Sequence, residues 1–121
     1  MPELEVEGAG TFEVEDGKRM VLAIEEDAKV DIMHQCGSHA HCATCRVEFL
    51  DGEPEDMTEA EHALLEMREL LGEARLSCQI LVEHDMKVRV LMTVSSTGAN
   101  SPGGKPEEEI TPPPVYIERP Y

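Results

Sequence analysis

The chain has 121 residues and a mass of 13.4 kDa, which is enough for one ordinary domain and too short for two. Its 26 acidic residues outnumber its 10 lysines and arginines, and the resulting charge of -16 makes nucleic acid and anionic lipid poor partners. The hydrophobic fraction of 40% can supply a core, but no apolar run approaches the roughly 20 residues of a membrane span. The composition therefore excludes a multidomain enzyme and favours a small, soluble, acidic protein.

The start of the chain, Met1-Pro2-Glu3-Leu4-Glu5, has neither the basic leader nor the apolar stretch of a signal peptide. We therefore expect a cytoplasmic protein, in a compartment that keeps thiols reduced. There, four cysteines are better explained by metal ligation or redox work than by disulfides.

The first expected elements are two strands over residues 4–7 and 11–15, where apolar and acidic residues alternate. Residues 8–10 contain two glycines and separate the strands as a turn, so a hairpin is predicted. Apolar residues then recur at helical spacing from Met20 to Ala28, which predicts a short helix beginning near Lys18. Residues 31–45 lose this periodicity and gather Cys, His, Gly and Ser, so they are predicted to form a loop.

A third strand is predicted over residues 46–50, and a longer helix follows it. Thr58 and Glu61 have the spacing of a capping box, in which the Thr58 hydroxyl accepts from the Glu61 N–H and the Glu61 side chain reaches back. Gly72 is the expected left-handed cap at the end of this helix. The face expected to be buried carries Ala60, Ala63, Leu64, Met67 and Leu71.

Two further strands, over residues 75–82 and 86–94, complete a folded domain predicted for residues 1–94. The order ββαβαββ indicates an α+β fold, in which helices pack against a small mixed sheet. Six of the eight prolines lie after residue 95, so residues 95–121 are predicted to be a Pro/Gly-rich, extended C-terminal tail. The tail is expected either to be disordered or to dock through its apolar residues, which are Ile110, Val115, Tyr116, Ile117 and Tyr121.

The cysteines are the strongest functional signal in the sequence. A C-x5-C-x2-C segment is followed 32 residues later by a fourth cysteine in a predicted strand; the four are Cys36, Cys42, Cys45 and Cys78. Two irons bridged by two sulfides need four thiolates that converge from two directions, which a loop and a distant segment can supply. Small residues at Gly37, Ser38 and Ala40 allow the loop to approach such a cluster and point its N–H groups at the sulfurs.

Two other metal sites are compatible with part of this pattern. Zinc also takes four thiolates, although zinc ribbons usually carry two C-x2-C knuckles and this sequence carries one. His34, His39 and His41 crowd the same loop, and imidazole replaces thiolate on one iron of Rieske centres. Because four cysteines are available, we expect these histidines to be exposed or to lie beside the cluster, where their protonation can make its potential depend on pH.

The cysteine segments resemble those of a known family. Cys36-Gly37 through Cys42-Ala43-Thr44-Cys45-Arg46, with Leu76-Ser77-Cys78-Gln79 downstream, is similar to the [2Fe–2S] ferredoxins of the β-grasp (ubiquitin-like) fold. The resemblance covers residues 3–94, and the five residues between the first two cysteines match the adrenodoxin-like and bacterial branch. It implies that Cys36 and Cys42 hold one iron and that Cys45 and Cys78 hold the other. The residues expected around the cluster are Gly37, Ser38, His39, Ala40, His41 and Thr44.

The resemblance also implies a function. Members of this family shuttle single electrons, so we expect a carrier between a flavin-dependent ferredoxin reductase and an acceptor redox protein. No nucleophile–base pair, phosphate loop or dinucleotide fingerprint is present in the sequence, so no catalysis of its own is expected. By analogy with the adrenodoxin-like proteins, the expected partner-binding residues are Asp56, Glu59, Glu66 and Glu69, although such charges can also serve solubility alone.

Three alternative functions stay open at this stage. The domain can be the electron-entry subunit of an oxygenase, a carrier that hands its cluster to other proteins during iron–sulfur cluster assembly, or a zinc-binding module. The excess of carboxylates predicts a low, negative reduction potential, because it opposes the addition of an electron.

Overall fold

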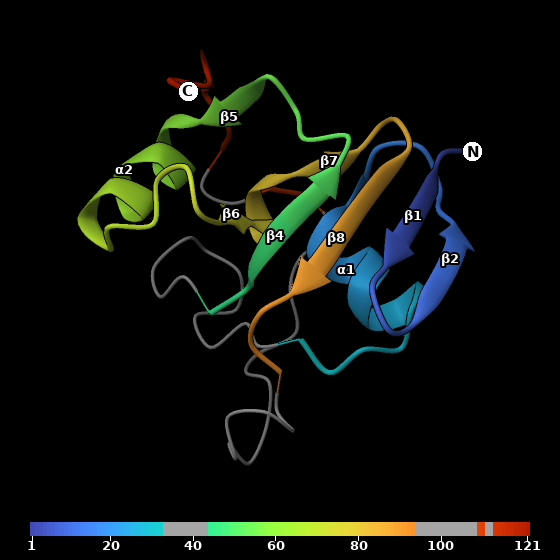
Figure 1. The fold of residues 1–121 in the computed structure, drawn as a ribbon. Coiled ribbons are helices and arrows are strands. Elements are labelled where there is room, and N and C mark those ends of the chain that lie inside the picture. The colour runs from blue at the N-terminus through green and yellow to red at the C-terminus, as the bar shows by residue number, and fades with distance from the viewer. Residues whose placement is uncertain (33–43, 94–108, 111–112) are drawn as a thin grey trace.

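The computed structural model describes residues 1–32, 44–93, 109–110 and 113–121 (Figure 1). Within these ranges no helix is long and apolar enough to cross a membrane. Along the chain the elements are β1 (Glu3–Val6), β2 (Gly10–Glu13), β3 (Lys18–Arg19), α1 (Met20–Leu22), the π-helix η1 (Ala23–Asp27), β4 (Arg46–Asp51), β5 (Asp56–Thr58), α2 (Glu59–Met67), β6 (Arg75–Leu76), the 3₁₀ helix η2 (Ser77–Gln79), β7 (Leu81–Val82), β8 (Met86–Val90) and β9 (Tyr116–Glu118).

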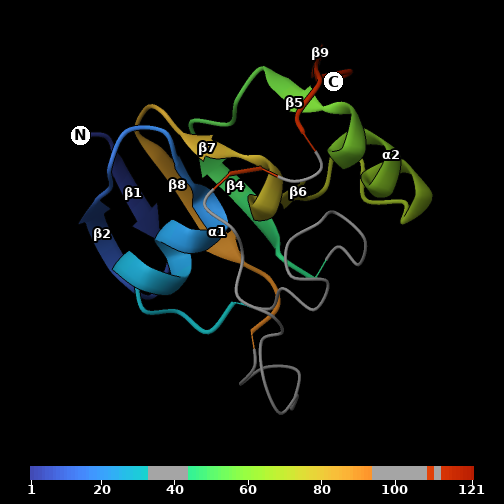
Figure 2. The ribbon, with the colours of Figure 1, turned by 180° about the vertical axis from the view of Figure 1, so that it is seen from behind.

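A five-stranded mixed sheet with the order β2-β1-β8-β4-β6 forms the centre of the molecule. β1 and β8 run parallel, and every other pair of neighbouring strands is antiparallel. Helices α1 and η1 cover one face of this sheet, as the view from behind shows (Figure 2). Leu4, Val6, Val47 and Val88 point into the core beneath them, because alternate residues of a strand face the same side. This arrangement confirms the predicted α+β, β-grasp fold.

The predicted N-terminal hairpin is confirmed, since β1 pairs antiparallel with β2. The first predicted helix, by contrast, begins later than expected. Lys18 and Arg19 pair with Val82 and Leu81 of β7, so they extend a ladder, and the helix starts only at Met20. The helix therefore starts where the apolar spacing starts, and the two residues before it belong to a strand.

Helix α2 has the predicted N-cap, because the Glu61 N–H donates to Thr58 Oγ1 at 3.1 Å. Its end was predicted wrongly: α2 stops at Met67, and Glu69, with φ of 59°, is the left-handed residue just beyond it. Gly72 does have the predicted left-handed conformation, with φ of 85°, but it lies in the turn that follows. The predicted buried face is wrong in part as well. Met67 is 71% exposed and Ala63 is exposed, whereas the residues that α2 buries are Glu61, Leu64 and Leu65.

The strand predicted over residues 75–82 is divided into β6 and β7 by the turn η2, so Cys78 lies in a 3₁₀ helix and not in a strand. The division has a topological cause, because β6 pairs with β4 in the main sheet while β7 pairs with β3 in a separate two-stranded sheet. β8 ends at Val90, before the predicted end, and Thr93 forms an isolated β-bridge with Ile32 beyond it.

The last residues of the chain dock on the domain beside α2 (Figure 1). β9 pairs antiparallel with β5, with Met57 opposite Ile117 and Thr58 opposite Tyr116. The first N–H groups of a helix have no partner within the helix. In α2 the Glu59 N–H donates instead to the Val115 carbonyl at 2.8 Å. Neither β5 nor β9 was predicted, since three-residue strands carry no readable alternation.

Candidate metal centre

Two of the predicted cysteine ligands lie in the described part of the chain, and folding brings their segments together. Cys45 ends the turn before β4, and Cys78 is the middle residue of η2. The antiparallel pairing of β4 with β6 places Arg46 opposite Leu76, and the Cys45 carbonyl accepts hydrogen bonds from the Ser77 N–H at 3.1 Å and from Ser77 Oγ at 2.7 Å. Both cysteines are buried, and neither forms a disulfide.

The other predicted ligands and most of their neighbours lie outside the described residues; they are Cys36, Gly37, Ser38, His39, Ala40, His41 and Cys42. Thr44 is described and directly precedes Cys45 in the turn. Across residues 1–32, 44–93, 109–110 and 113–121, no three His, Cys, Asp or Glu side chains gather in a way that could hold a metal ion. The described residues alone do not complete a four-thiolate set, and the assignment of the loop cysteines stays a prediction.

The surroundings of Cys78 suit a thiolate ligand of an iron–sulfur cluster. Gln79 Nε2 donates to Cys78 Sγ at 3.7 Å, and hydrogen bonds of this kind stabilise the negative charge on a ligand sulfur. On the other side of the residue, Arg19 Nε donates to the Cys78 carbonyl at 2.8 Å. Soft thiolates in a buried site with N–H donors fit the ligand preference of iron–sulfur clusters.

The Gln79 side chain is itself held by Thr58, the N-cap of α2. Thr58 Oγ1 donates to Gln79 Oε1 at 2.7 Å while it accepts from the Glu61 N–H. Because a hydroxyl can donate and accept at once, one side chain both caps the helix and orients the amide that reaches the Cys78 sulfur. The N-terminus of α2 is thereby connected to Cys78 through two buried polar side chains.

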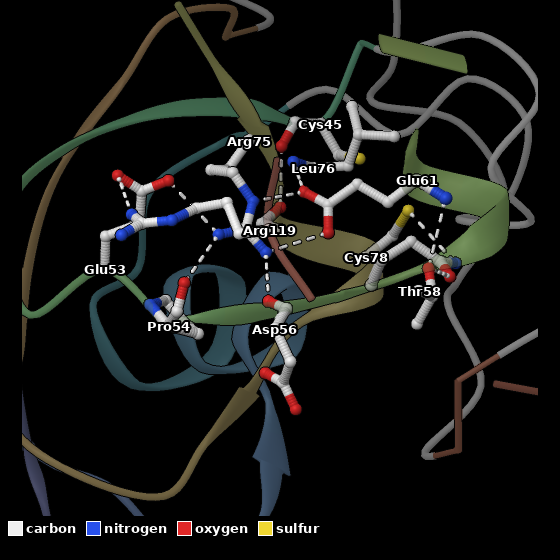
Figure 3. A network of polar contacts seen from close by, with 12 residues as sticks. Cys45, Glu53, Pro54, Asp56, Thr58, Glu61, Arg75, Leu76, Cys78 and Arg119 are labelled. Atoms are coloured by element: carbon white, nitrogen blue, oxygen red, sulfur yellow. Dashed lines mark hydrogen bonds and ion pairs between the residues drawn. The ribbon is translucent and has the colours of Figure 1, made fainter. Parts of the chain in front are cut away.

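A buried ion pair lies directly beside this connection (Figure 3). Arg75 binds both oxygens of Glu61, at 2.7 Å and 3.0 Å, and the Leu76 N–H donates to the same carboxylate at 2.9 Å. Burial raises the pKa of Glu61, and the bonds from Arg75 and the Leu76 N–H oppose that shift. The predicted return of Glu61 to its own helix start is therefore wrong, because the bidentate guanidinium is the stronger partner.

Arg75 also joins the C-terminal tail to the site. It donates to the carbonyls of Pro54 and Asp56 at 3.3 Å and 3.1 Å, and it contacts the Glu53 carboxylate at 3.3 Å. Glu53 in turn binds Arg119 at 2.9 Å and accepts from the Tyr121 hydroxyl at 2.7 Å. Burial alone would raise the pKa of Glu53, but the hydrogen bonds from Tyr121 and Arg119 outweigh it and lower the pKa.

The four acidic residues predicted to bind a partner are all exposed, on β5, on α2 and just beyond its end; they are Asp56, Glu59, Glu66 and Glu69. Glu66 is paired with His62 at 3.8 Å, one helical turn away. Glu61, in the same acidic stretch of the sequence, is completely buried and belongs to the Arg75 ion pair. The side of α2 that faces solvent is still acidic, because Glu59 and Glu66 are exposed.

Sequence reasoning did not identify Arg19, Arg75 or Gln79 as residues of the site. Arg75 and Gln79 could have been found, because they flank the Leu76-Ser77-Cys78 segment that carries the fourth cysteine. Arg19 has only a weak signal, because it is the second of two adjacent cations, Lys18 and Arg19, that precede the continuous apolar run Met20–Ile24. A cation in that place is exposed in most proteins, so only the fold shows that this one is buried.

The chain is similar to known proteins over most of its length. The family model for the 2Fe-2S iron-sulfur cluster binding domain matches residues 4–83. The chain is 35% identical to one subunit of the Na(+)-translocating NADH-quinone reductase of Methylococcus capsulatus over 89 residues, which are 73% of this chain and 21% of that subunit. It is 29% identical to terpredoxin of a Pseudomonas species over 87 residues, which are 68% of this chain and 82% of terpredoxin.

A solved structure shares the fold. The ISC-like [2Fe–2S] ferredoxin FdxB of Pseudomonas putida superposes with a TM-score of 0.58 at 24% identity, covering 75% of this chain and 93% of that one. The chain thus spans most of two small relatives and about a fifth of the longer reductase subunit.

Proposed function

The chain belongs to the family of 2Fe-2S iron-sulfur cluster binding domains, and from this premise we propose that it is a one-electron carrier whose [2Fe–2S] cluster is held by Cys36, Cys42, Cys45 and Cys78. When bound, such a cluster accepts and returns one electron. The observation that carries the ligand assignment is the convergence of Cys45 and Cys78, which are buried and come from segments far apart in the sequence. By the family pattern, these two cysteines hold one iron and the loop pair holds the other.

The chain's own contribution is to bind the cluster and set its potential. Burial of Cys45 and Cys78 keeps water from their sulfurs, and the Gln79 amide donates to one of them. The Gln79 bond favours the added electron, whereas burial and the net charge of -16 both disfavour it, because the reduced cluster carries more negative charge. We expect a reduction potential below zero, and a midpoint well above zero would contradict the four-thiolate assignment and favour a histidine-ligated site.

We further propose that a flavin-dependent reductase and an acceptor protein dock on the acidic side of α2, through Asp56, Glu59, Glu66 and Glu69. All four side chains are exposed, and a surface of one sign speeds encounter with a basic partner at low salt. Replacing Glu59 and Glu66 by Gln should slow reduction by the reductase several-fold at low salt, with a much smaller effect at high salt. Glu13→Gln plus Glu15→Gln on the N-terminal hairpin is the matched control for the change in net charge.

The cluster assignment is tested by the visible spectrum together with iron and acid-labile sulfide counts, before and after dithionite. We expect two irons and two sulfides per chain and a spectrum that bleaches and recovers through repeated cycles. Cys78→Ser should lose or destabilise the cluster, while Arg89→Gln, on the exposed face of the sheet, should retain it. A colourless protein that carries stoichiometric zinc would overturn the proposal.

A second candidate is an electron-entry domain within a larger oxidoreductase. The match to one part of the longer reductase subunit favours it. A free carrier should support turnover when it is mixed with a separate reductase and acceptor, and it should separate from both on gel filtration. An entry domain should instead co-purify with its oxidoreductase. A cluster-assembly carrier would lose its iron to an apo-acceptor protein, which neither of these functions requires.

A further inference from the structure

Among the described residues, Arg19 has the largest side chain that is fully buried, with an exposed fraction of 0%. It is the last residue of β3, held by its ladder pair with Leu81, and the following Met20 N–H donates to the Ile80 carbonyl at 2.8 Å. These backbone bonds anchor Arg19 against the segment that follows η2. Its position is therefore set by the fold and not by a flexible surface loop.

The guanidinium of Arg19 reaches the backbone of the proposed ligand Cys78. Nε donates to the Cys78 carbonyl at 2.8 Å, a contact between residues 59 apart in the sequence. That carbonyl belongs to the peptide that joins Cys78 to Gln79, whose side chain donates to the Cys78 sulfur. By holding this peptide, Arg19 restrains both the ligand residue and the donor at its sulfur.

Arg19 also brings a permanent charge into the interior. An arginine stays protonated in proteins, and charge interactions over a few ångströms are several times stronger in the interior than in water. Taking this cation out of water costs free energy, and a neighbouring cluster that gains negative charge on reduction would offset part of that cost.

On the premise of the proposed function, we propose that Arg19 is a positioning residue that holds the Cys78 peptide and raises the reduction potential of the bound cluster. The cation stabilises the reduced form, which carries one more negative charge than the oxidised form. It thereby offsets part of the effect of the acidic surface. A residue that served packing alone would affect stability and leave the potential unchanged.

The test compares Arg19→Gln and Arg19→Met, which remove the charge, with Arg19→Lys, which retains it. Arg89→Gln is the matched control, because it removes one positive charge from the exposed face of the sheet. The midpoint potential of each purified, cluster-loaded protein is measured by spectroelectrochemistry at low salt and at high salt. Iron and sulfide counts confirm equal loading.

We expect the neutral Arg19 variants to shift the redox equilibrium about tenfold toward the oxidised form, equivalent to about 59 mV for one electron. This shift should persist at high salt, because buried charges are screened weakly, whereas any shift in Arg89→Gln should disappear. Arg19→Lys should remain close to the wild type. Neutral variants that match Arg89→Gln, or a lysine variant that shifts as far as the methionine variant, would overturn the proposal.

If neither neutral variant assembles a cluster, Arg19→Lys decides the matter. A lysine variant with the wild-type potential supports the role of the charge, and one that is colourless or shifted tenfold contradicts it. The wild type separates this inference from its premise. A wild type without a reversible one-electron couple defeats the proposed function, whereas a wild type with such a couple and unmoved variants defeats the role of Arg19 alone.

Discussion

Two arginine–glutamate contacts of nearly the same length occupy opposite environments in this protein. Arg75 binds Glu61 at 2.7 Å beside the Cys78 segment, with exposed fractions of 2% and 0%. Arg89 binds Glu48 at 2.6 Å on the outer face of the sheet, where both side chains are almost half exposed. The buried pair also satisfies the Leu76 N–H and two backbone carbonyls, whereas the exposed pair has water as an alternative partner. Burial, and not the distance between the charges, therefore decides how much stability is lost when each pair is broken.

Breaking the buried pair should have the largest effect. Arg75→Met leaves the Glu61 carboxylate buried without its cation, and we expect a loss of about 3–5 kcal/mol in the free energy of unfolding, with loss of the cluster. Urea denaturation and iron content measure the two effects. The double variant Glu61→Leu plus Arg75→Met should recover much of the stability, because no buried charge is left unpaired. A single variant as stable as the wild type would contradict the comparison.

Removing the hydroxyl of Thr58 should have an intermediate effect. Thr58→Ala deletes the N-cap of α2 and the bond to Gln79, and we expect a cost of about 1–2 kcal/mol in the free energy of unfolding. The Gln79 amide also loses its anchor, so the potential should shift as well. Thr58→Ser keeps the hydroxyl and is the control. Equal reduction potentials in the alanine and serine variants would show that the hydrogen bonds from α2 to Cys78 do not affect the potential.

The tail supplies a pH-dependent contact of smaller size. Burial and the hydrogen bond to Glu53 raise the pKa of Tyr121 to about 12 from its usual 10. Because the folded pKa is the higher one, this contribution to stability is complete below pH 10 and is lost as the pH rises through 12. Absorbance titration of the phenolate should show the delayed ionisation, and Tyr121→Phe should remove that part of the titration. A single tyrosine transition at pH 10 would contradict docking of the tail in solution.

The Glu53 carboxylate of this contact makes stability depend on pH in the acid range. Its pKa is lowered, so its contribution is present above the ordinary carboxylate pKa of 4.5 and is lost as the pH falls through the lower folded value. Glu53→Gln should therefore flatten the loss of stability below pH 4.5 in a urea titration at several pH values. A variant whose stability falls as steeply as that of the wild type in this range would exclude Glu53 as the source.

The exposed pair should give the smallest effect. Arg89→Gln removes the contacts to Glu7 and Glu48, all of which water and salt can replace. We expect a change in the urea midpoint close to experimental error at high salt, measured beside Arg75→Met under the same conditions. A loss as large as that of the buried pair would show that the exposed pair is part of a cooperative network.

The sequence by itself determined the features that depend on neighbours in the chain. The N-terminal hairpin, the strand after Cys45 and the cap of α2 by Thr58 were readable, because alternation, turn residues and a hydroxyl three residues before an N–H act locally. The cysteine spacing identified the family, since the required ligand types and their order are a property of the chain. The partners of Glu61 could not be read in this way, because the capping pattern fits a local bond as well as it fits a distant guanidinium.

Only the tertiary structure decided which polar side chains are buried and which distant segments pair with each other. Cys78 lies in a turn because β6 and β7 belong to different sheets, and β9 joins β5 across a large part of the sequence. Arg19 is buried because a short ladder with β7 turns it inward toward the Cys78 carbonyl. Burial and long-range pairing are properties of the folded chain, and they set the charge and hydrogen-bond environment that a local pattern does not contain.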